Sequence, residues 1–249
     1  MQVAINTAVF LSELQKGTSQ LTCLQKLVGT NIKAVEVRGE FFDSTTRQQE
    51  LSNIATLCQQ QHWTLYYSVP DTLFTEAGVN PNLAAHLTLA KDCGVKALKY
   101  SFGTLTAAAK NAAVVTALKE QIEASGIQVT IENQPNADGT LATMHQNLTW
   151  CQQQRLPLGY TFDAGNWYWI DQQPEAAFQQ LQNFITVFHL KDIKQKETVL
   201  LGEGTTDWRS LLQQLAPQIP VFLEYAIAPA ELPQQIKLVN DVLKQQASS

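Results

Sequence analysis

The chain has 249 residues, of which 45% are hydrophobic and 16% charged, and its formal net charge is -5. An acidic balance without a Lys/Arg cluster argues against nucleic acid as the main partner, because phosphate binding draws on clustered positive charge. No apolar run approaches the roughly 18 residues of a membrane helix, and the first strand-like run starts at Val3, so we expect neither a membrane partner nor a signal peptide.

The four cysteines, Cys23, Cys58, Cys93 and Cys151, are far apart in the sequence and include no CxxC pair. This spacing is typical of reduced, buried thiols rather than of a zinc knuckle or a redox couple. We therefore expect a cytoplasmic protein. A chain of this length buries enough surface to fold without a metal or a disulfide, so any bound metal would serve chemistry.

Short apolar or β-branched runs recur along the chain, and each is followed by a segment with helical periodicity. The predicted strands cover residues 3–6, 32–38, 63–69, 95–101, 127–133, 158–163, 185–191 and 220–225. The predicted helices cover residues 21–27, 48–60, 82–92, 107–123, 143–153, 175–181, 208–215 and 231–246. Gly29, Gly94 and Gly126 stand where helices are expected to stop.

Eight strand and helix units of about 31 residues each close most economically as a (β/α)8 TIM barrel. A doubly wound open sheet is the alternative, but neither GxGxxG nor GxxxxGK[ST] follows the first strand. Proline and glycine are spread along the chain without marking a linker. We therefore predict an α/β fold in which residues 1–249 form a single domain.

Residues that could carry chemistry stand at the carboxyl ends of the last four predicted strands, where TIM barrels place their active sites. These residues are Glu132, Asp163, His189 and Glu224. Taken singly, each is compatible with an ordinary polar residue at a strand end. Together, three carboxylates and an imidazole at one end of a barrel suit a divalent ion such as Mn, Co, Mg or Zn. Open positions on that ion would accept two substrate oxygens.

Several short motifs lie at these strand ends and in the loops that follow. They are AVEVR (34–38), TIEN (130–133), TFDAGN (161–166), FHLKD (188–192), LGEGTTDW (201–208) and FLEY (222–225). In these motifs the chain resembles the xylose isomerase-like barrels, also called the sugar phosphate isomerase/epimerase or AP endonuclease family 2 group. The resemblance implies that Glu132, Asp163, His189 and Glu224 match the family's metal ligands. It also implies that Glu132 and Glu224 correspond to the carboxylates that move the proton in its ketose epimerases.

A physical argument supports the same two glutamates. A metal bound to a ketone and its neighbouring hydroxyl acidifies the intervening C–H by stabilising an enediolate. The proton then needs a base on one face of the substrate and an acid on the other, and Glu132 and Glu224 lie on strands separated by two others. Aldose–ketose isomerisation and C3 epimerisation both pass through an enediolate, so the residues leave both reactions open.

Five further residues are predicted to contact the substrate. Glu36 and Arg38 share one face of the second strand, and either could bind a hydroxyl, although pairing with neighbouring charges is the alternative. Lys191 shares the face of His189 and could bind a hydroxyl or a phosphate. Asn166 could hydrogen-bond a hydroxyl. Trp167 could stack on the apolar side of a sugar, or pack structurally.

The chain also departs from the family pattern. Asn166 stands where many members have a histidine, and Ile193, Lys194 and Gln195 follow HLKD where the epimerases have a substrate-binding arginine. Gly202 and Gly204 suggest either a mobile loop over the site or a rigid turn.

These observations favour a metal-dependent isomerase or epimerase of a small sugar or polyol-derived ketose. A dehydratase acting on 3-dehydroshikimate or inosose at the same site is an alternative, and so is a non-catalytic sugar-binding barrel. An endonuclease with three metals is disfavoured, because four histidines in the whole chain are too few for such a site. The residues do not indicate an oligomeric state, but the resemblance makes a homodimer possible, because dimers are common among such barrels.

Overall fold

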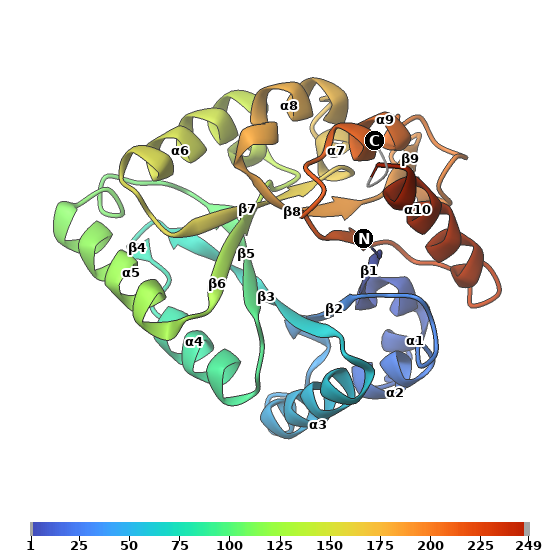
Figure 1. Ribbon diagram of the computed structural model, residues 1–249. Coiled ribbons are helices and arrows are strands. Elements are labelled where there is room, and N and C mark those ends of the chain that lie inside the picture. The colour runs from blue at the N-terminus through green and yellow to red at the C-terminus, as the bar shows by residue number, and fades with distance from the viewer. Residues whose placement is uncertain (1, 247–249) are drawn as a thin grey trace.

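The computed structural model describes residues 2–246, and in this part of the chain eight parallel strands close into a barrel (Figure 1). The barrel strands are β1 (Ala4–Asn6), β2 (Ala34–Arg38), β3 (Thr64–Thr75), β5 (Ala97–Gly103), β6 (Gln128–Glu132), β7 (Leu158–Asp163), β8 (Ile185–Leu190) and β11 (Val221–Leu223). Neighbours follow chain order, and the pairing of β1 with β11 closes the sheet on itself. The predicted TIM barrel is confirmed.

A helix follows each barrel strand, and the helices form a ring outside the sheet (Figure 1). The longer ones are α2 (Gln20–Gln25), α3 (Arg47–Gln61), α4 (Leu83–Asp92), α5 (Ala112–Ser125), α6 (Leu141–Gln153), α8 (Pro174–Leu181), α9 (Trp208–Gln214) and α10 (Leu232–Gln246). Shorter helical turns are η1 (Thr7–Phe10), α1 (Leu11–Leu14), η2 (Gly39–Phe41), η3 (Ala137–Gly139), α7 (Asn166–Trp169) and η4 (Gln182–Phe184).

Three elements differ from the prediction. β3 continues past the predicted end at residue 69 to Thr75, because Thr72 and Phe74 pair parallel with β5 and the last two residues pair antiparallel with β4 (Gly78–Val79). The helix predicted from residue 107 begins at Ala112, because the Asn111 side chain accepts the Ala113 N–H and so fixes the start. A hairpin of β9 (Asp192–Lys194) and β10 (Glu197–Val199) follows β8 and was not predicted.

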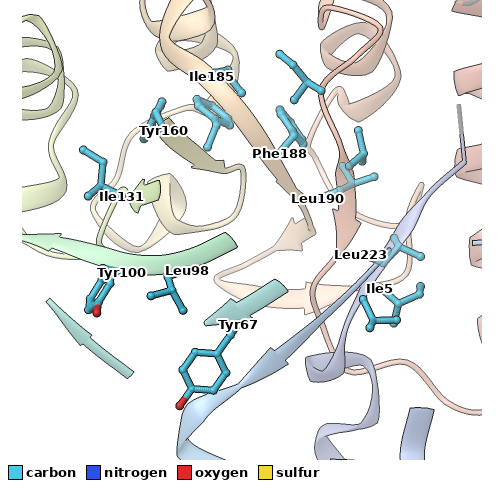
Figure 2. Close-up of a cluster of buried hydrophobic side chains, with 14 of the residues drawn as sticks. Ile5, Tyr67, Leu98, Tyr100, Ile131, Tyr160, Ile185, Phe188, Leu190 and Leu223 are labelled. Atoms are coloured by element: carbon cyan, nitrogen blue, oxygen red, sulfur yellow. The ribbon is translucent and has the colours of Figure 1, made fainter. Parts of the chain in front are cut away.

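The outward face of the barrel carries the main apolar core. Side chains alternate along a strand, so every second residue points to the helices. Figure 2 shows part of this layer, including Ile131 of β6, Tyr160 of β7 and Phe188 of β8, all 0–1% exposed. The Phe162 and Phe188 rings stack with centroids 5.3 Å apart. Burial of this layer against the helix ring stabilises the fold.

The inward face is divided between apolar and polar residues. Ala4, Ala34, Val187 and Phe222 form a small buried cluster that is separate from the main core. Closer to the carboxyl ends of the strands, the inward positions are polar but still buried. They are occupied by Asn6, Glu36, Lys99, Thr130, Glu132, Thr161, Asp163 and His189. The strands therefore deliver polar side chains to the carboxyl end of the barrel.

Two further findings bear on the predictions from composition. All four cysteines are free and buried. Among residues 2–246, no helix has the length and apolar character needed to cross a membrane.

Candidate metal centre

Four buried side chains from four neighbouring strands converge at the carboxyl end of the barrel. Glu132 ends β6, Asp163 ends β7, His189 lies on β8, and Glu224 directly follows β11. Each offers one ligand atom, and these atoms all lie within 4.8 Å of one another. The structure thus brings together the four predicted ligands, because parallel strands in register end at the same rim.

The innermost atoms of this cluster meet without hydrogen bonds. His189 Nδ1 lies 2.9 Å from Glu132 Oε1 and 2.9 Å from Glu224 Oε2. All three atoms are buried, and none of them makes a hydrogen bond of normal geometry. Buried polar atoms that make no hydrogen bond cost free energy. A cation bound by all three would satisfy them, so this donor set fits a divalent metal ion.

The other ring nitrogen of His189 faces a buried carboxylate. His189 Nε2 lies 3.3 Å from Glu36 Oε1, and that oxygen also accepts the Asn6 amide at 2.5 Å. A carboxylate in this position favours a proton on Nε2, so Nδ1 is the ring nitrogen that a metal ion would use. Glu36, predicted as a substrate contact, therefore sits behind His189.

Three cations surround the cluster. Lys99 Nζ lies 2.7 Å from Glu132 Oε2, and Arg38 donates to Glu224 Oε1 at 2.9 Å. Lys191 Nζ lies 2.6 Å from Asp163 Oδ2 and 3.0 Å from Glu224 Oε2. Arg38 and Lys191 remain partly exposed, at 26% and 16% of their side chains, so both border the opening of the site.

Comparison with known sequences identifies the family. The sequence profile of the xylose isomerase-like TIM barrels matches residues 25–244. The chain belongs to this family. No curated protein sequence matches the chain.

Many solved structures share this fold. A D-tagatose 3-epimerase-like protein aligns with a TM-score of 0.72 at 16% identity, over 100% of this chain and 99% of that one. The probable 3-DHS dehydratase AsbF of Bacillus anthracis, involved in petrobactin synthesis, aligns with a TM-score of 0.70 at 17% identity, over 96% and 99%. An AP endonuclease, family 2, of Brucella melitensis gives a TM-score of 0.67 at 12% identity, over 97% and 99%. At these low identities, the similarity establishes that the fold is shared but does not assign an activity.

Burial and the surrounding charges set the ionisation of the two glutamates. Burial opposes the ionisation of Glu132, but Lys99 and His189 outweigh it and lower the pKa of Glu132 to about 2. Burial also opposes the ionisation of Glu224, whose pKa His189 and Lys191 hold well below its usual range. Both glutamates are therefore carboxylates at neutral pH, the form that binds a cation and accepts a proton.

The two residues predicted from the β7 loop take different places. Asn166 donates its side-chain amide to the Asn133 carbonyl at 2.8 Å and its backbone N–H to Asp163 Oδ1 at 3.1 Å. It thus lies beside the cluster. Trp167 is fully buried, with its ring 5.7 Å from that of Phe162, a place that fits core packing rather than stacking on a ligand.

The glycine loop after β8 is held by a buried carboxylate. The Asp192 side chain accepts four backbone N–H groups, from Ile193, Gly202, Gly204 and Thr206, at 2.8–3.1 Å. A Cβ on Gly204 would come within 2.1 Å of Asp192 Oδ1. This geometry fits the rigid turn rather than the mobile loop, and it explains why HLKD and GEG occur together.

Asn6 and Lys99 contact the cluster but were missed in the sequence. Asn6 is the last residue of β1, so the strand-end rule that found Glu132 also applied to it. Lys99 lies in the interior of β5, two residues after Ala97, and a lysine in the middle of a buried strand was the available signal.

Proposed function

We propose that this protein is a divalent-metal-dependent isomerase or epimerase that acts on a small ketose or aldose through an enediolate. The observation that carries the proposal is the convergence of Glu132 Oε1, His189 Nδ1 and Glu224 Oε2, buried and without hydrogen bonds, next to Asp163. Such a donor set suits Mn, Mg, Co or Zn. A metal bound there supplies a Lewis acid that polarises a carbonyl and its neighbouring hydroxyl.

The two glutamates then divide the proton transfer. Glu132 and Glu224 come from β6 and from the end of β11, which are separated by β7 and β8, so they can approach a bound substrate from different sides. Each directs one oxygen into the cluster and holds the other against a cation, Lys99 or Arg38. In an isomerisation, one carboxylate accepts the proton from the carbon next to the carbonyl and returns that proton to the neighbouring carbon of the enediolate. In an epimerisation, the other glutamate first takes up a proton from solvent and then delivers it to the opposite face.

The predicted substrate contacts belong to the same proposal. Arg38 and Lys191 border the opening and would bind substrate oxygens, and Asn166 lies beside them. Glu36 would act by orienting His189. A small sugar or polyol-derived partner, the cytoplasmic location and the homodimer also remain predictions.

A metal-dependent dehydratase is the second candidate. The cations Arg38 and Lys191 at the opening favour it, because they could bind a substrate carboxylate such as that of 3-dehydroshikimate. Both reactions begin with removal of the same kind of proton, so the product distinguishes them.

Deuterium exchange followed by NMR tests the proposal. Metal-stripped protein is incubated in D2O with ketoses, aldoses and 3-dehydroshikimate, with and without Mn or Mg. We expect metal-dependent deuterium uptake next to a carbonyl, lost in Glu132→Gln and Glu224→Gln. Glu120→Gln, an exposed position on α5, is the matched control and should exchange normally. Metal binding without any exchange would favour a sugar-binding barrel, and absence of metal binding would refute the metal centre.

A further inference from the structure

The three cations of the site contact different oxygens of the carboxylates. Lys99 contacts Glu132 Oε2 and Arg38 contacts Glu224 Oε1, which are the oxygens turned away from His189 Nδ1. Lys191 instead lies 3.0 Å from Glu224 Oε2, the oxygen that faces Nδ1. Lys99 and Arg38 can therefore keep their contacts when a metal binds, whereas Lys191 shares an oxygen with it.

The second contact of Lys191 points to the same conflict. Asp163 Oδ1 already accepts the backbone N–H groups of Gly165, at 2.8 Å, and Asn166, at 3.1 Å. Oδ2 is thus the Asp163 oxygen left for a metal, and Lys191 Nζ lies 2.6 Å from it. The ammonium group contacts two of the four ligand atoms that the centre offers.

The Lys191 side chain has a fitted place in the fold. Its stem lies over Gly165, where a Cβ would come within 2.8 Å of Lys191 Cδ and 3.2 Å of its Cβ. The φ of Gly165 is negative, so the backbone does not require a glycine at this position. The absence of a side chain instead leaves space for the lysine stem. Only 16% of the lysine side chain is exposed, and its long stem lets the ammonium swing toward the opening.

We propose that Lys191 competes with the metal for Asp163 Oδ2 and Glu224 Oε2, and that it turns to a substrate oxygen once the metal holds them. An ammonium and a divalent ion repel each other, and Lys191 Nζ lies on the two oxygens that the metal would use, so each weakens the binding of the other. The displaced ammonium then lies beside the metal with a free donor for a hydroxyl, carboxylate or phosphate oxygen. Metal would thus bind before substrate. This inference rests on the metal centre of the proposed function, but not on any particular reaction.

The test measures Mn affinity by isothermal titration calorimetry on metal-stripped protein. We expect Lys191→Met to bind Mn more tightly by about tenfold or more, because the competing cation is removed. Lys99→Met is the matched control: it removes one buried ammonium that contacts another ligand carboxylate, but on the outer oxygen. It should bind Mn no more tightly than the unmodified protein, because Glu132 loses the group that orients it.

A second variant removes the competition without changing any charge. Gly165→Ala should displace the Lys191 stem and also tighten Mn binding, and circular dichroism confirms that each variant folds. Equal gains in Lys191→Met and Lys99→Met would mean general charge repulsion and overturn the inference, as would unchanged affinity in Gly165→Ala. If neither the unmodified protein nor these variants bind Mn, the inference fails together with the metal centre. If the affinities change as expected but no sugar reacts, only the proposed reaction fails.

Discussion

The two faces of the barrel strands consist of alternate residues of the same segments, but one face packs against the helices and the other carries the candidate metal centre. Phe188 and Leu190 of β8 point outward into the helix layer, whereas His189 between them points inward to the metal centre. The outward face is apolar and held by burial. The inward face near the carboxyl rim holds buried charged side chains. A (β/α)8 barrel can therefore vary its chemistry without changing its core, because strand parity separates the two sets.

The largest expected effect lies on the outward face. Phe188→Ala removes a ring that stacks on Phe162 and should cost about 3–5 kcal/mol of unfolding free energy. Urea unfolding measures this cost. Trp169→Ala, at a ring that is 38% exposed, serves as the control and should cost far less. Because strand parity isolates the two faces, Mn affinity of folded Phe188→Ala should be unchanged; a marked loss would break the separation.

A smaller effect is expected on the inward face, behind the ligands. Glu36→Gln removes the carboxylate that faces His189 Nε2 and should lower metal affinity by about 10–100-fold. Calorimetric titration with Mn measures it. Glu40→Gln changes an exposed carboxylate that contacts Arg38 at the rim, and is the matched control. Equal affinities for Glu36→Gln and the unmodified protein would show that Glu36 has no orienting role.

The loop after β8 tests whether the rim belongs to the stable part of the molecule. Gly204→Ala places a methyl group against Asp192 and should lower the unfolding free energy by about 1–3 kcal/mol. Thermal unfolding gives the change in Tm, with Glu203→Ala, exposed in the same turn, as control. A Tm equal to that of the unmodified protein would mean that the turn yields, and that the loop is mobile after all.

The mildest prediction concerns the thiols of the helix layer. Burial raises the pKa of Cys23 to about 11 and of Cys58 and Cys151 to about 12. A raised pKa means less thiolate at any pH below it, so these thiols should react with DTNB at pH 8 at least about a hundredfold more slowly than free cysteine. Unfolding in urea should restore the reaction rate of these three thiols to that of free cysteine, because it removes the burial that raises their pKa. Rapid reaction in the native protein would show that the outer layer opens.

The sequence was informative about the second half of the barrel and less so about the first. Glu132, Asp163, His189 and Glu224 are strand-end residues of metal-binding type, so position and chemistry both marked them. Asn6 and Lys99 carry no such combined signal, since an asparagine and a lysine occur in many settings. For Trp167 the position in the sequence was misleading. It follows a strand that ends in a predicted metal ligand, which suggested a substrate contact, but its ring is buried in the core.

The sequence by itself determined the order of strands and helices, because the alternation of apolar residues and the helix stops are local features of the chain. It also determined which strands end in metal-binding residues. Only the tertiary structure decided which carboxylate oxygens face His189 and which cation holds each of the others. Those choices depend on closing β1 against β11 and on side-chain packing between strands far apart in the chain, which local sequence does not encode.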